Sequence, residues 1–509
     1  MNYPNRISIA RQVMKKRVIW MSLLAGMTCT ATAFGQTKFP IAEQATSYEV
    51  TGFGSAATGG QTPFWQVSNR QAKVPLESGN GYLSGALYHR QAFANGWRWG
   101  AGMEVIAAVP RDREVYVQQL YAEVGYRYLQ LSIGSKEKHY GLVDARLSTG
   151  DMAYSGNASP IPEVNISIPR FTVVPFTKGW LQLKGDFAVG RSFDKNTVER
   201  FAGERETYIY NVLWHHKSLA VQIKDTRHGF PLAAQIGVNH WAQWGGTSNN
   251  PKIGTQPHSF KDFIRVVCGK SGDSQATISD QVNVLGAHYG TYDFKLSYQH
   301  SNWQFSAYYQ HYFNDLSGMV FENNLDGLWG GELTLKHTSW LKKVAIEYIT
   351  TRNQSGPFHF IWFDHEKHPG VGGGGDDYYN NGEYRTGFSY ANRAIGSPLL
   401  LSPAYNANGV VSFRHTRIQD WHFAAEGALS KQVSYRVMFT KMNSWGTPNW
   451  PLLAKQGGTS SLIEISYQHP RLTDWQFCGS IGLDTGTLLG DHVGFSLSVT
   501  KRGILKQWK

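Results

Sequence analysis

The sequence predicts an all-β protein, a transmembrane antiparallel β-barrel of about 16–18 strands. Three observations point to this fold. The N-terminal segment is typical of exported proteins, hydrophobic and polar residues alternate along most of the remaining chain, and short turns alternate with long connections. Short turns at one end and long loops at the other are the plan of an outer-membrane barrel.

The composition is that of a large folded chain. It has 509 residues, of which 41% are hydrophobic, 14% aromatic and 17% charged. Disordered chains are highly charged and poor in aromatic residues, so the composition excludes disorder. Past residue 35 no stretch approaches the roughly 18 apolar residues of a spanning helix, which excludes a helical membrane protein. A soluble enzyme and a barrel both remain open at this point.

Residues 1–35 are expected to be a signal peptide. A basic run, Lys15-Lys16-Arg17, precedes an apolar stretch from Val18 to Ala33 that ends in small residues. Without this segment the formal charge falls from +12 to +7, because it holds five basic residues and no acidic ones. This modest excess, with no clustered basic run, argues against a nucleic-acid partner.

The repeating unit of the remaining chain is an amphipathic strand. Tyr292, Phe294 and Leu296 would share one face of such a strand, whereas Asp293 and Lys295 would share the other. The polar face carries full charges, as in the lumen of a barrel or on the wet face of a soluble sandwich. The same period of two recurs in residues 303–310, 433–440, 463–468, 475–483 and 493–500.

Four polar turns are followed by Trp, one spacer and a second aromatic residue, with the tryptophans at Trp97, Trp303, Trp421 and Trp475. Residues two apart on a strand point to the same face. We therefore expect a ring of tryptophans near one rim, as in the aromatic girdle of a membrane barrel. The alternative is that each Trp simply packs against its own hairpin in a soluble β-protein.

The chain is expected to divide into a short preface and a barrel. Residues 36–79 would form the preface and a possible plug segment, and residues 80–509 the outer-membrane barrel. The long connections are expected near residues 136–178, 240–285, 351–412 and 443–460.

Two segments resemble a known family. They are Thr62-Pro63-Phe64-Trp65-Gln66-Val67-Ser68-Asn69-Arg70 and the stretch from Leu147 to Glu163. Together they resemble the capsule assembly Wzi family. The resemblance implies a barrel of about eighteen strands in the outer membrane of a Gram-negative bacterium, with short helical or irregular elements plugging the lumen. It also implies a lectin-like protein that holds capsular or extracellular polysaccharide at the cell surface.

The same resemblance implies a protein that is not an enzyme, needs no cofactor, and works as a monomer in contact with outer-membrane lipid. The family-motif loop supplies Ser155, Asn157, Ala158, Pro160 and Pro162. Proline cannot donate to a ladder, so a regular central strand is excluded there. The Asn157 side chain could bond sugar hydroxyls, but a bond to the loop's own backbone is favoured.

The richest candidate for ligand binding is the expected 351–412 loop. A lectin site needs flat aromatic faces for sugar C–H groups and carboxylates or amides for hydroxyls. The candidate ligand-binding residues are Trp362, Asp376, Asp377, Tyr378, Tyr379 and Asn380. The alternative is an aromatic-rich loop that folds onto the barrel mouth or into the lumen.

Other functions stay open on the sequence alone. A porin or solute transporter is the main alternative, because a plugged lumen and an open pore have similar compositions. No Ser/His/Asp set, carboxylate pair or metal-binding spacing stands out, so neither catalytic nor metal-binding residues are expected. Whether Cys268 and Cys478 pair cannot be read from the sequence.

Overall fold

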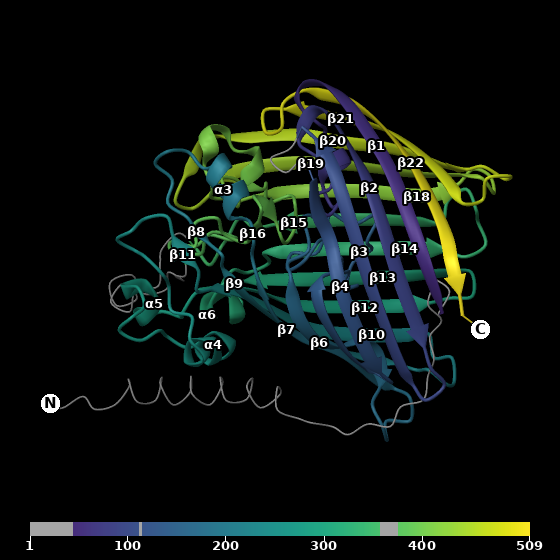
Figure 1. Ribbon diagram of the computed structural model, residues 1–509, viewed down its shortest axis with the longest axis horizontal. Helices are drawn as coiled ribbons and strands as arrows, with labels where there is room; N and C mark the ends of the chain where they lie inside the picture. The colour runs from purple at the N-terminus through teal and green to yellow at the C-terminus, as the bar shows by residue number, and fades with distance from the viewer. Residues whose placement is uncertain (1–43, 111–114, 357–374, 509) are drawn as a thin grey trace.

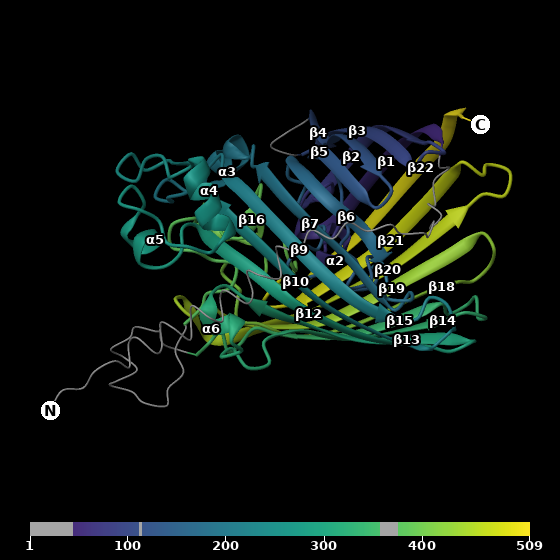
Figure 2. The same ribbon diagram turned by 90° about the horizontal axis from the view of Figure 1, so that it is seen from below.

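The computed structural model describes residues 44–110, 115–356 and 375–508, so the expected signal peptide lies outside the described residues. Within them, a closed antiparallel sheet of eighteen strands forms a barrel, shown in Figures 1 and 2. Neighbouring strands follow chain order, and β22 pairs back onto β1, for example Phe53 with Ser498. Closure pairs the backbone of both edge strands, as a lipid environment requires.

The barrel strands are β1 (Ala45–Gln61), β2 (Glu77–Ala92), β3 (Trp97–Val109), β4 (Val115–Tyr126), β5 (Leu129–Ser135), β6 (Glu163–Val173), β7 (Leu181–Arg191), β9 (Leu213–Lys224), β10 (Leu232–Trp244), β12 (Ala287–Gln299), β13 (Trp303–Phe313), β14 (Gly327–Leu335), β15 (Lys343–Thr350), β18 (Gln419–Ala428), β19 (Val433–Gly446), β20 (Pro451–Gln468), β21 (Trp475–Gly486) and β22 (His492–Gln507). Two short strand pairs lie outside the barrel sheet: β8 (Ile209–Tyr210) with β11 (Thr247–Ser248), and β16 (Ser389–Tyr390) with β17 (Arg393–Ala394).

The helices are short. They are α2 (Phe64–Val67), α3 (Lys195–Phe201), α4 (Phe260–Val267), α5 (Ile278–Val282), α6 (Leu316–Met319) and the 3-10 turns η1 (Pro403–Tyr405) and η2 (Ala407–Gly409). Among the described residues, no helix is long and apolar enough to cross a membrane.

The alternation read from the sequence sets the two faces of the wall. Phe294 and Leu296 on β12 are exposed on the outside, whereas Asp293, just before Phe294, is buried on the lumen side. Neighbouring strands repeat the pattern and build an apolar outer belt, as in membrane barrels. Other members of the belt are Leu83, Leu131, Ile133, Ile166, Ile236, Phe305, Ile346, Phe423, Ile463, Ile481 and Leu497.

The two ends of the barrel differ. Ala45 pairs with Gln507, so the chain enters β1 and leaves β22 at one end, which we call the terminal end. Connections at this end are short, whereas those at the other, the loop end, are mostly long; helices α3 to α6 gather there (Figures 1 and 2). In membrane barrels short turns are periplasmic and long loops extracellular. The loop end is therefore the extracellular end.

The expected single ring of tryptophans is only partly right. Trp97, Trp303 and Trp475 begin β3, β13 and β21 at the terminal end, but Trp421 is the third residue of β18, near the loop end. Trp421 follows the long connection after β15 rather than a short turn, so its strand runs in the opposite direction.

The expected division at residue 80 is wrong, because Ala45–Gln61 is already the first barrel strand. Its glycine, serine and threonine content, as in Thr51-Gly52-Phe53-Gly54-Ser55, weakens the hydrophobic alternation that marks the other strands. The expected loop at 443–460 is also wrong, because β19 and β20 occupy nearly all of it. The sequence Gly446 to Pro451 forms only a tight connection between the two strands.

The lumen is filled by three segments that leave the wall. The first plug segment (residues 62–76) carries α2, the second (136–162) carries the family motif, and the third (375–418) carries β16, β17 and both 3-10 turns. Their buried side chains and inward-facing wall residues form one hydrophobic cluster. For example, Tyr154 stacks on Trp241 of β10 with ring centroids 5.6 Å apart.

The apolar outer belt predicts that an arginine destabilises the protein more at an outward position of β10 than at the adjacent inward position. Ile236 is 59% exposed on the outside, whereas Gln235 beside it lines the lumen near acidic side chains. We expect Ile236→Arg to lower the free energy of unfolding in lipid by about 2–4 kcal/mol, because the charge enters the hydrocarbon layer. Gln235→Arg should change it by less than about 1 kcal/mol. Urea titrations in vesicles measure both, and equal losses would contradict the assigned faces.

Candidate functional site

Inward side chains of the wall bind the backbone of the plug. The Glu347 carboxylate accepts hydrogen bonds from the Thr149 amide at 2.7 Å and the Thr149 hydroxyl at 2.6 Å. Asp484 accepts from the Phe64 amide at 2.8 Å, and the Gln310 side chain from the Met152 amide at 2.6 Å. An irregular segment can be buried only when its backbone polar groups find such partners. The polar faces of the strands therefore supply the hydrogen-bond partners that allow the plug to be buried.

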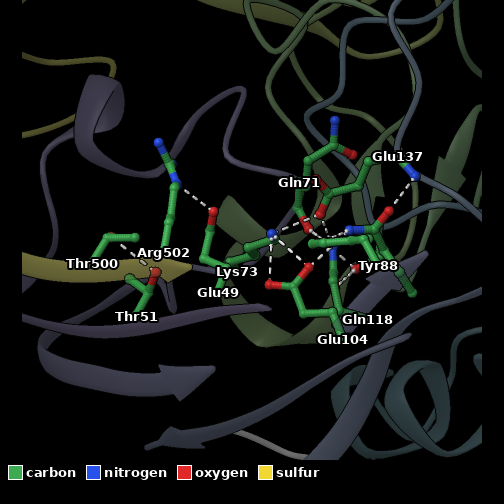
Figure 3. Close-up of polar contacts among 12 residues, drawn as sticks. Glu49, Thr51, Gln71, Lys73, Tyr88, Glu104, Gln118, Glu137, Thr500 and Arg502 are labelled. Atoms are coloured by element: carbon green, nitrogen blue, oxygen red, sulfur yellow. Dashed lines mark hydrogen bonds and ion pairs between the residues drawn. The ribbon is translucent and has the colours of Figure 1, made fainter. Parts of the chain in front are cut away.

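Lys73 ties two plug segments to the wall (Figure 3). Its ammonium lies 2.9 Å from the Glu104 carboxylate of β3 and 2.8 Å from that of Glu137 in the second plug segment. The Gln118 side chain donates to Glu137 at 3.1 Å and to the Gln71 carbonyl at 2.9 Å. Burial lowers the pKa of Lys73, but the two carboxylates outweigh it and raise that pKa above its ordinary value. Lys73 is therefore a charged link between plug and wall.

A second ionic cluster holds the first plug segment. Arg70 donates to the Glu464 carboxylate of β20 at 2.6 Å, and Arg436 of β19 donates to the same carboxylate at 2.9 Å. Arg146 of the second plug segment pairs with Glu426 of β18 at 2.8 Å. Glu464 is buried, so removing one of its cations leaves an uncompensated charge, and its pairs fix the plug in one position. The Arg146–Glu426 pair is more exposed and contributes less.

The family-motif loop joins all three plug segments. Asn157 donates to the Ala394 carbonyl at 3.2 Å and accepts from the Asn69 amide at 3.2 Å. Ser155 donates to the Gly396 carbonyl at 2.7 Å, and Ala158 packs in the hydrophobic cluster. Pro160 is buried, and the Pro162 carbonyl accepts from the Arg191 amide at the end of β7. The Asn157 side chain thus bonds to backbone groups, but these belong to the first and third plug segments and not, as expected, to its own loop.

Three of the expected ligand residues lie inside the plug. Tyr378 and Tyr379 have 0% exposure, and their hydroxyls bond to the Asn323 amide at 2.6 Å and the Met152 carbonyl at 2.6 Å. Asp376 accepts from the Ser355 hydroxyl at 2.7 Å, and burial raises its pKa to about 7. A buried ring offers no face to a sugar, so we assign these three residues to the folding of the plug. The sequence pattern does not distinguish the two roles.

Trp362 lies outside the described residues, but Asp377 and Asn380 reach the extracellular rim. Asp377 accepts hydrogen bonds from Thr416 at 2.9 Å, Asn380 at 3.1 Å and Asn449 at 3.2 Å. Burial raises the pKa of Asp377, and these hydrogen bonds oppose the rise. The contact with Asn449 links the third plug segment to the turn between β19 and β20.

Aromatic and cationic side chains gather at this same place on the rim. The Arg352 guanidinium lies 4.1 Å from the ring centroid of Trp445, and that of Arg414 lies 4.9 Å from Trp450. Lys455 also approaches Trp445, at 6.0 Å. Arg352, Asn449, Trp450 and Lys455 are exposed to solvent. We call this set, Arg352, Arg414, Trp445, Asn449, Trp450 and Lys455, the rim patch.

The sequence does not predict the rim patch, because the patch joins three segments far apart in the chain. Arg352 follows β15, Arg414 belongs to the plug, and the tryptophans flank the β19–β20 turn. The one local signal is the stretch Trp445-Gly446-Thr447-Pro448-Asn449-Trp450, in which two tryptophans bracket turn-forming residues.

The lumen also holds a cavity of ≈ 240 Å³ between the second plug segment and the wall strands β5 to β12. Its polar lining is largely paired with itself. Asn239 donates to Asp293 at 2.8 Å, and Asn165 donates to Asp186 at 2.8 Å. We therefore regard this cavity as a packing feature of the plug rather than the ligand site.

The profile of the family described as capsule assembly protein Wzi matches residues 42–400. The chain belongs to this family. The match covers well over half of the chain and includes the first two plug segments. The resemblance stated from the two motifs is thereby confirmed, and the chain is a member of a family of capsule assembly proteins.

The fold is similar to that of solved outer-membrane barrels. Wzi of Escherichia coli, an outer membrane protein involved in group 1 capsule assembly and a carbohydrate-binding β-barrel, shares 13% identity at a TM-score of 0.54, over 90% of this chain and 84% of that one. OccK5 of Pseudomonas aeruginosa shares 10% identity at 0.47, over 91% and 99%. OprD of Pseudomonas aeruginosa shares 10% identity at 0.44, over 94% and 100%. No curated protein sequence matches the chain.

The Lys73 link predicts a local loosening of the plug. Lys73→Met leaves Glu104 and Glu137 buried without their cation, so amide hydrogens of residues 62–76 should exchange at least about tenfold faster, as loss of on the order of 1.4 kcal/mol implies. Hydrogen-exchange mass spectrometry of the folded protein measures this. Arg502→Met is the control, since its pair with Glu49 is largely exposed (Figure 3). Unchanged exchange in Lys73→Met would show that the Lys73 ion pairs do not hold the first plug segment.

Proposed function

We propose that this member of the Wzi family binds capsular or extracellular polysaccharide at the rim patch and retains it at the cell surface. The observation that carries the proposal is the group of two tryptophans, three cations and an amide at the extracellular end, of which Trp450, Arg352, Lys455 and Asn449 are exposed. Membership of a capsule assembly family and the carbohydrate binding of Escherichia coli Wzi support it. The protein would act by holding the polymer, without catalysis and without a cofactor.

The chemistry of the rim patch favours an acidic polymer. A tryptophan face can stack on the C–H surface of a sugar ring. Arginine presents planar donors that match a carboxylate, and the Asn449 amide can exchange bonds with hydroxyls. Asp377 already accepts three side-chain hydrogen bonds, so it would orient Asn449 rather than contact the polymer. Binding should weaken with added salt, because exposed charges are screened.

We also propose that the protein works as a monomer surrounded by outer-membrane lipid. Eighteen strands of one chain close the barrel, so no second chain is needed to complete the wall. The apolar belt supplies the lipid-facing surface. The alternative of a porin or solute transporter has less support, because three plug segments fill the lumen and are fixed by buried ion pairs and hydrogen bonds.

The rim patch predicts a binding defect. In a strain that lacks the gene, polymer synthesis should continue while cell-bound polymer falls, and the wild-type gene should restore it. In a separate assay of purified protein on immobilised polymer, we expect Trp450→Ala to bind the polymer about tenfold more weakly than the wild type, equivalent to about 1.4 kcal/mol. Loss of the stacking face and of its contact with Arg414 is the reason.

Trp340→Ala is the matched control for this experiment. Trp340 and Trp450 are both 63% exposed, but Trp340 lies in the β14–β15 turn at the terminal end. The Trp340→Ala variant should bind polymer as the wild type does. Equal binding by both variants and the wild type would refute the rim patch, and unchanged cell-bound polymer in the deletion strain would refute the function.

A further inference from the structure

Two extracellular loops fold back over the outside of the wall. On β10, Trp241 and Gln243 face the plug, so Ala242 and Trp244 face outward. Both outward residues are nonetheless buried, in a cluster with Val266 of α4 and with Ala276 and Leu285 of the same loop. The β10–β12 loop therefore packs against the outer wall (α4 lies beside the loop end of the barrel in Figures 1 and 2).

The next loop along the wall does the same. Gln310 and Tyr312 of β13 face inward, so His311 faces outward. The Phe321 ring, from the β13–β14 loop, stacks on His311 at 4.2 Å and on Tyr292 of β12 at 5.8 Å. We call the two folded-back segments, residues 260–282 and 316–325, the collar.

The collar presents hydrophobic side chains away from the wall. Phe260 of α4 is 77% exposed and Ile278 of α5 is 81% exposed. Other exposed apolar side chains of the collar are Ile264, Val282, Leu316, Val320 and Leu325. Isolated exposed hydrophobic residues are ordinary, but this many on two successive loops at the loop end of the wall indicate an interaction surface.

Most of these hydrophobic residues belong to helices; Val320 and Leu325 follow α6. Ser259 and Asp262 form a capping box at the start of α4, and the Thr277 hydroxyl accepts from the Asp280 amide at the start of α5. Lys217 of β9 donates to the Val267 carbonyl at the end of α4, which fastens the helix to the wall. The orientation of the apolar side chains is therefore set by the fold.

The collar docks on the wall at about the level where the hydrocarbon layer of the membrane ends. Strand β10 has 13 residues. At about 3.3 Å per residue and a tilt of about 40°, it rises about 30 Å, roughly the thickness of the hydrocarbon layer. Its outward face is exposed at Leu232 and Ile236, passes the half-buried His240, and ends at Trp244, where α4 docks. The collar thus lies at the loop end of the lipid-facing belt, just beyond the outward-facing His240 and His311.

We propose that the collar is embedded in the outer leaflet of the membrane, with its apolar side chains among the lipid acyl chains. Amphipathic helices occupy this position in monotopic proteins. Lys261 and Lys270 lie next to the apolar residues and are exposed, so they can meet lipid phosphates. The collar would hold one side of the extracellular mouth at the membrane surface while the rim patch faces outward.

Depth-dependent fluorescence quenching tests the proposal. Full-length protein with Cys29→Ser, Cys268→Ser and Cys478→Ser receives single cysteines, which are labelled with an environment-sensitive fluorophore. It is studied in phosphatidylcholine vesicles with nitroxide-labelled acyl chains. Phe260→Cys and Ile278→Cys should be quenched at least half as strongly as Leu296→Cys on the belt. Arg385→Cys, an exposed position of the plug, should show about threefold less quenching or lower.

Quenching at 260 and 278 no greater than at 385 would overturn the proposal. If those two positions are shielded from both lipid nitroxide and aqueous iodide, a second copy of the chain covers the collar, which would also overturn it. The measurement uses no polysaccharide, so its outcome is independent of the proposed function.

Discussion

The fit between polar wall and irregular plug is the constraint on which the rest of the structure depends. A barrel of eighteen strands encloses a lumen that side chains of the wall alone do not fill. Here the inward carboxylates and amides of the wall, such as Glu347 and Gln310, bind backbone amides of the plug. The same residues that make the lumen polar thus allow three loops to be buried.

This arrangement accounts for where function can lie. Because the plug fills the lumen, the groups available to a polymer are those at the extracellular rim. There the third plug segment carries Asp377 and Arg414 beside the β19–β20 turn, and the rim patch results from their meeting. The plug therefore both closes the barrel and supplies part of the surface proposed to bind polysaccharide.

The sequence predicted the wall better than the site, for physical reasons. Period-two alternation is a local property, so the faces of β12 and β13 follow from a few residues, whereas β1 was missed because glycine and serine weaken its pattern. Burial is not local. Tyr378 and Tyr379 have the composition of a sugar site, yet both are in the core of the plug, and no local pattern brings Arg352 beside Trp445.

The central claim is that the wild-type barrel is a closed scaffold rather than a channel. Conductance of the purified protein in planar lipid bilayers tests it most directly. The plug, held by buried ion pairs and by hydrogen bonds to the wall, predicts no large steady current at moderate voltage. A stable ohmic conductance of the size expected of an open eighteen-stranded porin would contradict the account.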